Sequence, residues 1–134
     1  VAVEAAEELR LLEFGQRLLH RRRNLLLPAG TQSTGAALYD LAGAGGAQAL
    51  SGDIGRIELG ARADLVVLNG SAPLLAGKSG DAILDTYVFS GGRELVRDVY
   101  VGGKRVIADG HHPDEEDIAS AFAAVMGRLL ADGD

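Results

Sequence analysis

The 134-residue sequence predicts an α/β fold, of the α+β kind within the residues given, and three observations predict it. Two long segments at the start of the chain carry apolar residues at helical spacing. From Gly55 onward the pattern changes to short, β-branched runs that include a Gly-Gly hairpin signal. After Pro113 the helical spacing returns. Helices at both ends of the chain should therefore flank one small sheet.

The first predicted helix covers residues 3–23, and its apolar residues form two adjacent stripes. One stripe consists of Leu9, Leu12 and Leu19 with the polar Gln16 among them, and the other consists of Leu11, Phe14 and Leu18. So wide an apolar arc indicates a helix that packs against a large body such as a barrel wall. Arg21, Arg22 and Arg23 follow at the end of the helix, where positive charge favours the macrodipole. We interpret them as a solvated helix end, with an anion site as the alternative.

The second predicted helix runs from about Thr34 to Leu50, with Ser33 or Thr34 as its N-cap. It contains glycines at positions 43, 45 and 46. Each glycine costs about 1 kcal/mol relative to alanine inside a helix, so close packing against a neighbouring backbone should compensate. A phosphate-binding loop is the less favoured interpretation, because such loops place their glycines between a strand and the start of a helix.

The sheet is predicted to begin with residues 55–60, where apolar and polar residues alternate, and to continue with the apolar run 63–69. Residues 81–89 suit either a short helix or a strand, and we favour the helix. Residues 95–101 and 104–108 form the clearest hairpin signal. The Gly102-Gly103 pair between them can adopt the positive φ values of a primed two-residue turn.

The last predicted helix begins with four carboxylates after Pro113 and continues along an apolar face. The four are Asp114, Glu115, Glu116 and Asp117, and the apolar residues are Ile118, Phe122, Val125, Leu129 and Leu130. Acidic residues stabilise a helix N-terminus, so we interpret the run as a helix start, with a metal or catalytic role as the alternative.

Composition excludes several classes of function. The net charge of −6, the pI near 5.0 and the lack of a larger basic cluster argue against nucleic-acid binding. No apolar run approaches the roughly 20 residues needed to span a bilayer. The absence of cysteine excludes disulfides, thiolate catalysis and cysteine-ligated metals, and fits a reducing compartment.

Candidate catalytic and metal-binding residues are few. The three histidines are His20, His111 and His112. His20 lies in an arginine-rich helix end, where a surface histidine is expected. His111 and His112 are adjacent, and neighbouring side chains of an extended segment point in opposite directions, so a shared metal ion is not favoured. No serine stands in a nucleophile motif. The residues by themselves therefore predict no active site.

Two segments resemble the C-terminal signature of the amidohydrolase superfamily. Residues 55–68 read Gly-Arg-Ile-Glu-Leu-Gly-Ala-Arg-Ala-Asp-Leu-Val-Val-Leu, and residues 99–106 read Val-Tyr-Val-Gly-Gly-Lys-Arg-Val. In that superfamily the first segment leads from the barrel into a small β-sandwich, and the second is similar to a later hairpin of that sandwich. Segments 7–18, 45–50, 89–92 and 96–99 are similar to the formimidoylglutamate deiminases of histidine degradation, and this likeness extends from about residue 3 to residue 130.

The resemblance implies a (β/α)8 barrel that holds one zinc ion. A His-x-His pair, a further histidine and an aspartate bind this ion, and the ion activates water for attack on the formimino carbon. None of these ligands has a counterpart in the sequence, and the aspartate would lie just before Val1. We therefore assign no catalytic, cofactor-binding or metal-binding residue to the chain. For Asp64, in the Ala-Asp motif, we expect a structural hydrogen-bonding role rather than catalysis.

The expectation is thus a C-terminal fragment of a cytoplasmic zinc hydrolase, itself inactive and without a cofactor. Residues 1–54 would be the terminal barrel helices, 55–110 part of the β-sandwich, and 111–134 a helix packing back on the body. Its partners would be the remainder of the enzyme, the small-molecule substrate and, in the parent, a second subunit of a homodimer. The alternatives are the tail of another amidohydrolase-superfamily deaminase or chlorohydrolase, or a non-enzymatic partner-binding module.

Overall fold

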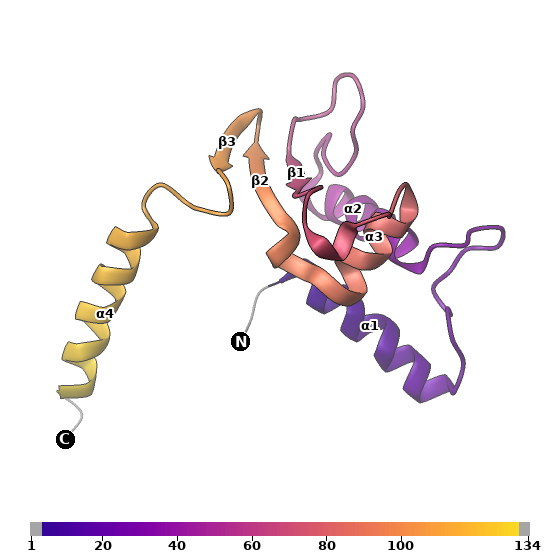
Figure 1. Ribbon diagram of the computed structural model, residues 1–134, viewed down its shortest axis with the longest axis horizontal. Helices are drawn as coiled ribbons and strands as arrows, with labels where there is room; N and C mark the ends of the chain where they lie inside the picture. Colours follow the sequence, from indigo (N-terminus) through magenta and orange to yellow (C-terminus); the bar gives the residue numbers. More distant parts are fainter. Residues whose placement is uncertain (1–3, 132–134) are drawn as a thin grey trace.

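The computed structural model describes residues 4–131 and has the predicted α/β character (Figure 1). The helices and strands are α1 (Ala5–His20), α2 (Thr34–Leu50), β1 (Leu65–Leu68), α3 (Asp81–Thr86), β2 (Val96–Val101), β3 (Lys104–Ile107) and α4 (Glu115–Ala131). Short helical turns occupy Pro73–Leu75, Tyr87–Gly91 and Gly92–Leu95. In Figure 1, α1, α2 and α3 lie with the sheet in one body, and α4 stands apart from it. No helix in the described part of the chain is long and apolar enough to cross a membrane.

The first two helices match their predictions. Helix α1 ends where Arg21 adopts a left-handed conformation, with φ of 50°. Helix α2 begins after Ser33, whose hydroxyl accepts a hydrogen bond from the Ala36 backbone N–H at 3.0 Å. Because that bond satisfies one of the free N–H groups of the first turn, Ser33 is the N-cap.

One glycine of α2 has the predicted packing role. A Cβ atom on Gly43 would lie 2.8 Å from the carbonyl oxygen of Gly55, so only glycine allows the two backbones to approach this closely. A Cβ atom on Gly45 or Gly46 would meet nothing within 4 Å. Close packing therefore explains Gly43, and nothing in the structure explains Gly45 and Gly46.

The strands form an antiparallel sheet in the order β1-β2-β3. Val66 pairs with Val99, which pairs in turn with Ile107. The predicted hairpin is confirmed, since Gly102 and Gly103 have φ values of 57° and 80° between β2 and β3. The predicted short helix at residues 81–89 is also confirmed as α3, which continues into a wider helical turn over Tyr87–Gly91.

The prediction of a strand at residues 55–60 was wrong. Ile57 and Leu59 are 91% and 102% exposed, and no described segment pairs with them. The segment instead forms a loop closed by the backbone N–H of Arg62, which donates to the Asp53 carbonyl at 2.7 Å, and Arg56 forms exposed ion pairs with Asp53 and Glu58 inside it. Alternation of apolar and polar residues makes a strand only where a neighbouring strand pairs its backbone groups.

The core lies between the helices rather than under the sheet. Its buried residues are Ala6, Leu38, Leu75, Tyr87, Val88 and Leu95. They bring α1 and α2 together with the segment from Pro73 to Leu95. Residues 111–134 were expected to pack back on the body. None of the described residues of α4 is buried, and α4 stands apart from the other elements (Figure 1). Residues 132–134 lie outside the described residues, and the three-part division of the chain stays a prediction.

The contact of Gly43 with Gly55 predicts opposite effects for two alanine substitutions in α2. Gly45→Ala should stabilise the fold by about 0.5–1 kcal/mol, because alanine is the better helix former and the site is open. Gly43→Ala should destabilise it by about 1–3 kcal/mol, because the new methyl group forces the Gly55 backbone away. Urea unfolding of the two variants measures both values, and equal stability of the pair would refute the packing role of Gly43.

Candidate functional site

The residues considered for metal binding form the start of α4. The Nδ1 atom of His111 lies 2.7 Å from Oε1 of Glu115, and the backbone N–H of His112 donates to Oε2 of the same carboxylate at 3.1 Å. Asp114 donates its backbone N–H to Nδ1 of His112, and its carbonyl accepts from the N–H of Ile118. The hydrogen bond with His111 lowers the pKa of Glu115, and the bond from the His112 backbone adds to the effect. These contacts are those of a helix N-terminus.

The other predicted candidates are dispersed. His20 and Arg21, Arg22 and Arg23 are exposed at the end of α1. Among residues 4–131, no three side chains of histidine, aspartate or glutamate are placed so that they could hold a metal ion together. The described residues therefore do not fit the zinc site that the family resemblance implies.

Asp64 has the hydrogen-bonding geometry expected for it. Its Oδ1 atom accepts the backbone N–H of Gly102 at 2.7 Å and lies 3.1 Å from Nε of Arg62. The N–H of Gly103 donates to the carbonyl of Ala63 at 2.8 Å. Together these bonds fasten the hairpin turn to the residues that precede β1.

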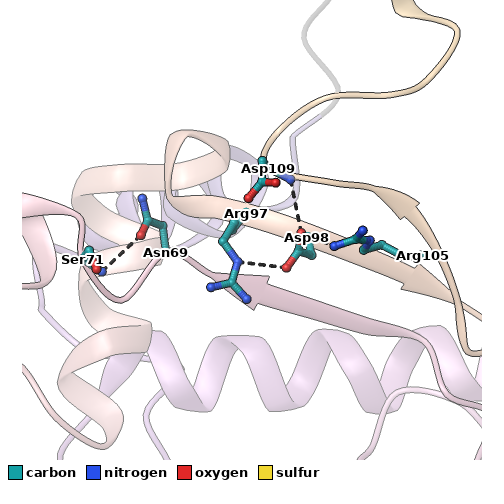
Figure 2. Close-up of polar contacts among 6 residues, drawn as sticks. All are labelled: Asn69, Ser71, Arg97, Asp98, Arg105 and Asp109. Carbon is teal, nitrogen blue, oxygen red and sulfur yellow. Dashed lines mark hydrogen bonds and ion pairs between the residues drawn. The ribbon is translucent and has the colours of Figure 1, made fainter.

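Asp98 on β2 is a buried carboxylate that the sequence pattern did not predict. Asp98 is only 3% exposed, and its Oδ2 atom accepts from Nε of Arg97 at 2.9 Å (Figure 2). Its Oδ1 atom accepts the backbone N–H of Asp109 at 3.2 Å and lies 3.8 Å from the Arg105 guanidinium. The bond from Arg97, followed by that from Asp109, lowers the pKa of Asp98. The available sequence signal was a charged pair, Arg97-Asp98, inside an otherwise apolar strand.

The cluster around Asp98 joins three parts of the chain. Asp109 follows β3 and has a φ of 50°, and Gly110 donates its N–H to the Arg97 carbonyl at 2.7 Å. At the end of β1, Asn69 donates its backbone N–H to Leu95 at 2.8 Å, and its side chain accepts the N–H of Ser71 at 3.1 Å (Figure 2). All of these bonds satisfy backbone groups at strand ends, which is a structural task.

Glu13 on α1 is a second buried carboxylate that the sequence did not reveal. It is inaccessible to solvent, and its Oε1 atom accepts the backbone N–H of Asn24 at 3.0 Å. The Arg17 guanidinium lies 3.7 Å from the same oxygen. Neither Oε2 of Glu13 nor Nε of Arg17 has a hydrogen-bond partner. Because it binds the backbone just after α1, Glu13 fixes how the chain leaves that helix.

An apolar cavity with a volume of about 710 Å³ lies between α1, α2 and β1. Its walls are mostly apolar, with Leu9, Leu65 and Tyr87 among them. Burial raises the pKa of the Tyr87 phenol, with smaller contributions from Tyr39 and Glu4. No histidine or serine lines the cavity within the described residues. Its ionisable lining residues are Glu8, Tyr39, Asp40, Arg56, Asp64 and Tyr87.

The lowered pKa of Asp98 predicts how stability depends on pH. The pKa of Asp98 is lower in the folded state than in the unfolded state, where an aspartate has a pKa of about 3.9. Its ionised carboxylate therefore stabilises the fold at pH values above the unfolded-state pKa. This stabilisation is lost as the pH falls through the folded-state pKa. Asp98→Asn should therefore be less stable than the natural chain at pH 7, and the difference should shrink toward pH 3. Urea unfolding at the two pH values measures it.

Asp109→Asn is the matched control for this prediction. It keeps the backbone N–H that binds Asp98, and asparagine tolerates the positive φ at this position. This variant should follow the acid profile of the natural chain. A stability difference between Asp98→Asn and the natural chain that is the same at pH 7 and pH 3 would contradict the assigned role of Asp98.

The chain is similar to known proteins over most of its length. The chain is 51% identical over 130 residues to a formimidoylglutamate deiminase from Pseudomonas aeruginosa. That match covers 97% of the chain and 29% of the relative, so the chain spans less than a third of the relative's length. In structure it is similar to a crystal structure of an amidohydrolase from Brucella melitensis, with a TM-score of 0.78 and 39% identity. This likeness covers 93% of the chain and 27% of the solved chain.

The family assignment rests on most of the sequence. Residues 2–106, which include α1, α2, α3 and the sheet, match the amidohydrolase family. They contain both segments in which the resemblance was seen, residues 55–68 and 99–106. The chain therefore belongs to the amidohydrolase family.

Proposed function

We propose that the chain is the C-terminal part of a formimidoylglutamate deiminase, which hydrolyses N-formimino-L-glutamate to N-formyl-L-glutamate and ammonia. In that reaction water adds to the formimino carbon, the C–N bond to the terminal nitrogen breaks, and the nitrogen leaves as ammonia. The observation that carries the proposal is the 51% identity to a relative of that name, sustained over 97% of the chain. The likeness to a solved amidohydrolase over nearly the same share of the chain supports it.

In this proposal the chain supplies structure and the rest of the enzyme supplies the reacting groups. Residues 1–54 are the terminal helices of a barrel, 55–110 are part of a small β-sandwich, and 111–134 form a final helix. A zinc ion is bound by residues outside the chain, since the described residues do not fit a metal site. The enzyme acts in the cytoplasm, in histidine degradation, as a homodimer.

The exposed apolar faces of the helices support the proposal that the remainder of the enzyme is the partner of this chain. On α1, Leu18 and Leu19 are 79% and 74% exposed, and on α4, Phe122 is 66% exposed. Large exposed apolar faces mark surfaces that another body covers. The same observation favours the second candidate, a non-enzymatic module that binds a separate protein partner through these faces.

Activity measurements distinguish the two candidates. The product of the complete reading frame that contains this sequence, supplied with zinc, should release ammonia from N-formimino-L-glutamate, and the 134-residue chain alone should release none. The chain alone lacks the reacting groups, so its activity should remain at the level of buffer. Ammonia from each sample is measured by a coupled glutamate dehydrogenase assay.

Guanine, cytosine and adenosine serve as control substrates in the same assay. Ammonia release from one of these but not from N-formimino-L-glutamate would replace the proposed substrate with that of a related deaminase. Ammonia release by the 134-residue chain alone would refute the proposal that its role is structural. A complete product that is inactive on every substrate would favour the partner-binding module.

A further inference from the structure

The connection between the hairpin and α4 is built from hydrogen bonds. Ala108 and His111 form an isolated antiparallel bridge, in which each donates its N–H to the other's carbonyl, at 3.0 and 2.9 Å. Between them, Asp109 and Gly110 have φ values of 50° and 84°, as a tight turn requires. We call residues 108–112 the elbow. It leaves little freedom between the end of β3 and the start of α4.

Both ends of the elbow are fastened. At the hairpin end, Asp98 binds the N–H of Asp109, and the Arg97 carbonyl binds the N–H of Gly110, so the elbow is held on β2, the central strand of the sheet. At the helix end, the carboxylate of Glu115 binds both His111 and His112, so the elbow is tied to the first turn of α4. A continuous set of bonds thus runs from the sheet to the helix.

This set of bonds explains why α4 stands away from the sheet, a position that apolar burial alone does not favour. The apolar residues of α4 at positions 118, 122, 125 and 129 lie on one face, and their exposure would fall if the helix folded back on the body. The helix instead stands away from the sheet (Figure 1). Folding back would require the bonds from Asp98, Arg97 or Glu115 to break.

We propose that Asp98 is the positioning residue that fixes the direction of α4, and that the elbow makes this helix a rigid arm rather than a loose tail. Of the side chains on the sheet, Asp98 is buried and binds the elbow directly. The arm presents its apolar face in one orientation relative to the hairpin. This inference does not depend on the proposed enzymatic function.

Distance measurements by double electron–electron resonance test the proposal on the 134-residue chain. The chain has no cysteine, so introduced pairs are its only spin-label sites. One pair, Gln48→Cys with Ala124→Cys, reports the distance from α2 to α4 at exposed positions. The other pair, Gln48→Cys with Lys104→Cys, reports the distance from α2 to the hairpin.

We expect narrow distance distributions from both pairs in the otherwise natural chain. Asp98→Ala should broaden the distribution from α2 to α4 at least twofold in width and leave the distribution from α2 to the hairpin narrow. Asp64→Ala is the matched control, because it removes a carboxylate that also binds a backbone N–H and an arginine, but at the opposite end of the hairpin. It should leave the distribution from α2 to α4 narrow.

Three results would overturn the proposal. Without any substitution at Asp98, a broad distribution from α2 to α4 beside a narrow distribution from α2 to the hairpin would show that the arm is not rigid in a folded chain. An unchanged distribution in Asp98→Ala would show that Asp98 does not set its direction. Broadening of both distributions in Asp98→Ala would show that Asp98 holds the hairpin as a whole and has no separate role in positioning α4.

Discussion

Packing around Tyr87 and Val88 is the interaction on which the rest of the described structure depends. Val88 is completely buried, its carbonyl accepts a hydrogen bond from Nε of Arg10 at 2.8 Å, and the Tyr87 ring meets that of Tyr39 edge-on at 6.1 Å. These contacts attach the turn after α3 to both α1 and α2. The chain then passes through Leu95, which is also buried, directly into β2. This segment therefore attaches β2 to the helices, while residues 51–64 connect α2 to β1 and pack on α2 where Gly55 meets Gly43.

That core is small for the amount of apolar surface the chain carries. Within residues 4–131, seven hydrophobic residues are buried, whereas the leucines on the outer side of α1 and the apolar residues of α4 are exposed. A domain that folded for itself alone would bury such faces, because apolar burial is the main force that opposes conformational entropy. The imbalance agrees with a chain that covers less than a third of the length of its relative. In the proposal that the chain is part of a larger enzyme, the remainder of that enzyme covers these helix faces.

Features decided by neighbouring residues were predictable from the sequence, and features decided by distant contacts were not. The Ser33 cap, the Gly102-Gly103 turn and the acidic start of α4 each depend on the conformational preferences or hydrogen bonds of a few consecutive residues. The supposed strand at residues 55–60 failed because a strand requires a partner that this segment lacks. Asp98 was overlooked because its burial results from Asp109, eleven residues further on, and from both strands of the hairpin.

The acidic character of the chain has a structural explanation at several positions. In the described part of the chain, five carboxylates accept a backbone N–H from a residue at least eleven positions away. The pairs are Glu4 with Arg93, Glu13 with Asn24, Asp64 with Gly102, Asp85 with Gly35, and Asp98 with Asp109. Hydrogen bonds to a charged acceptor are stronger than those between neutral groups, so each pair can hold two distant segments in place with little apolar contact. Where the apolar core is small, carboxylates bound to backbone amides take over part of its task, and these five are accounted for without assigning any of them to catalysis.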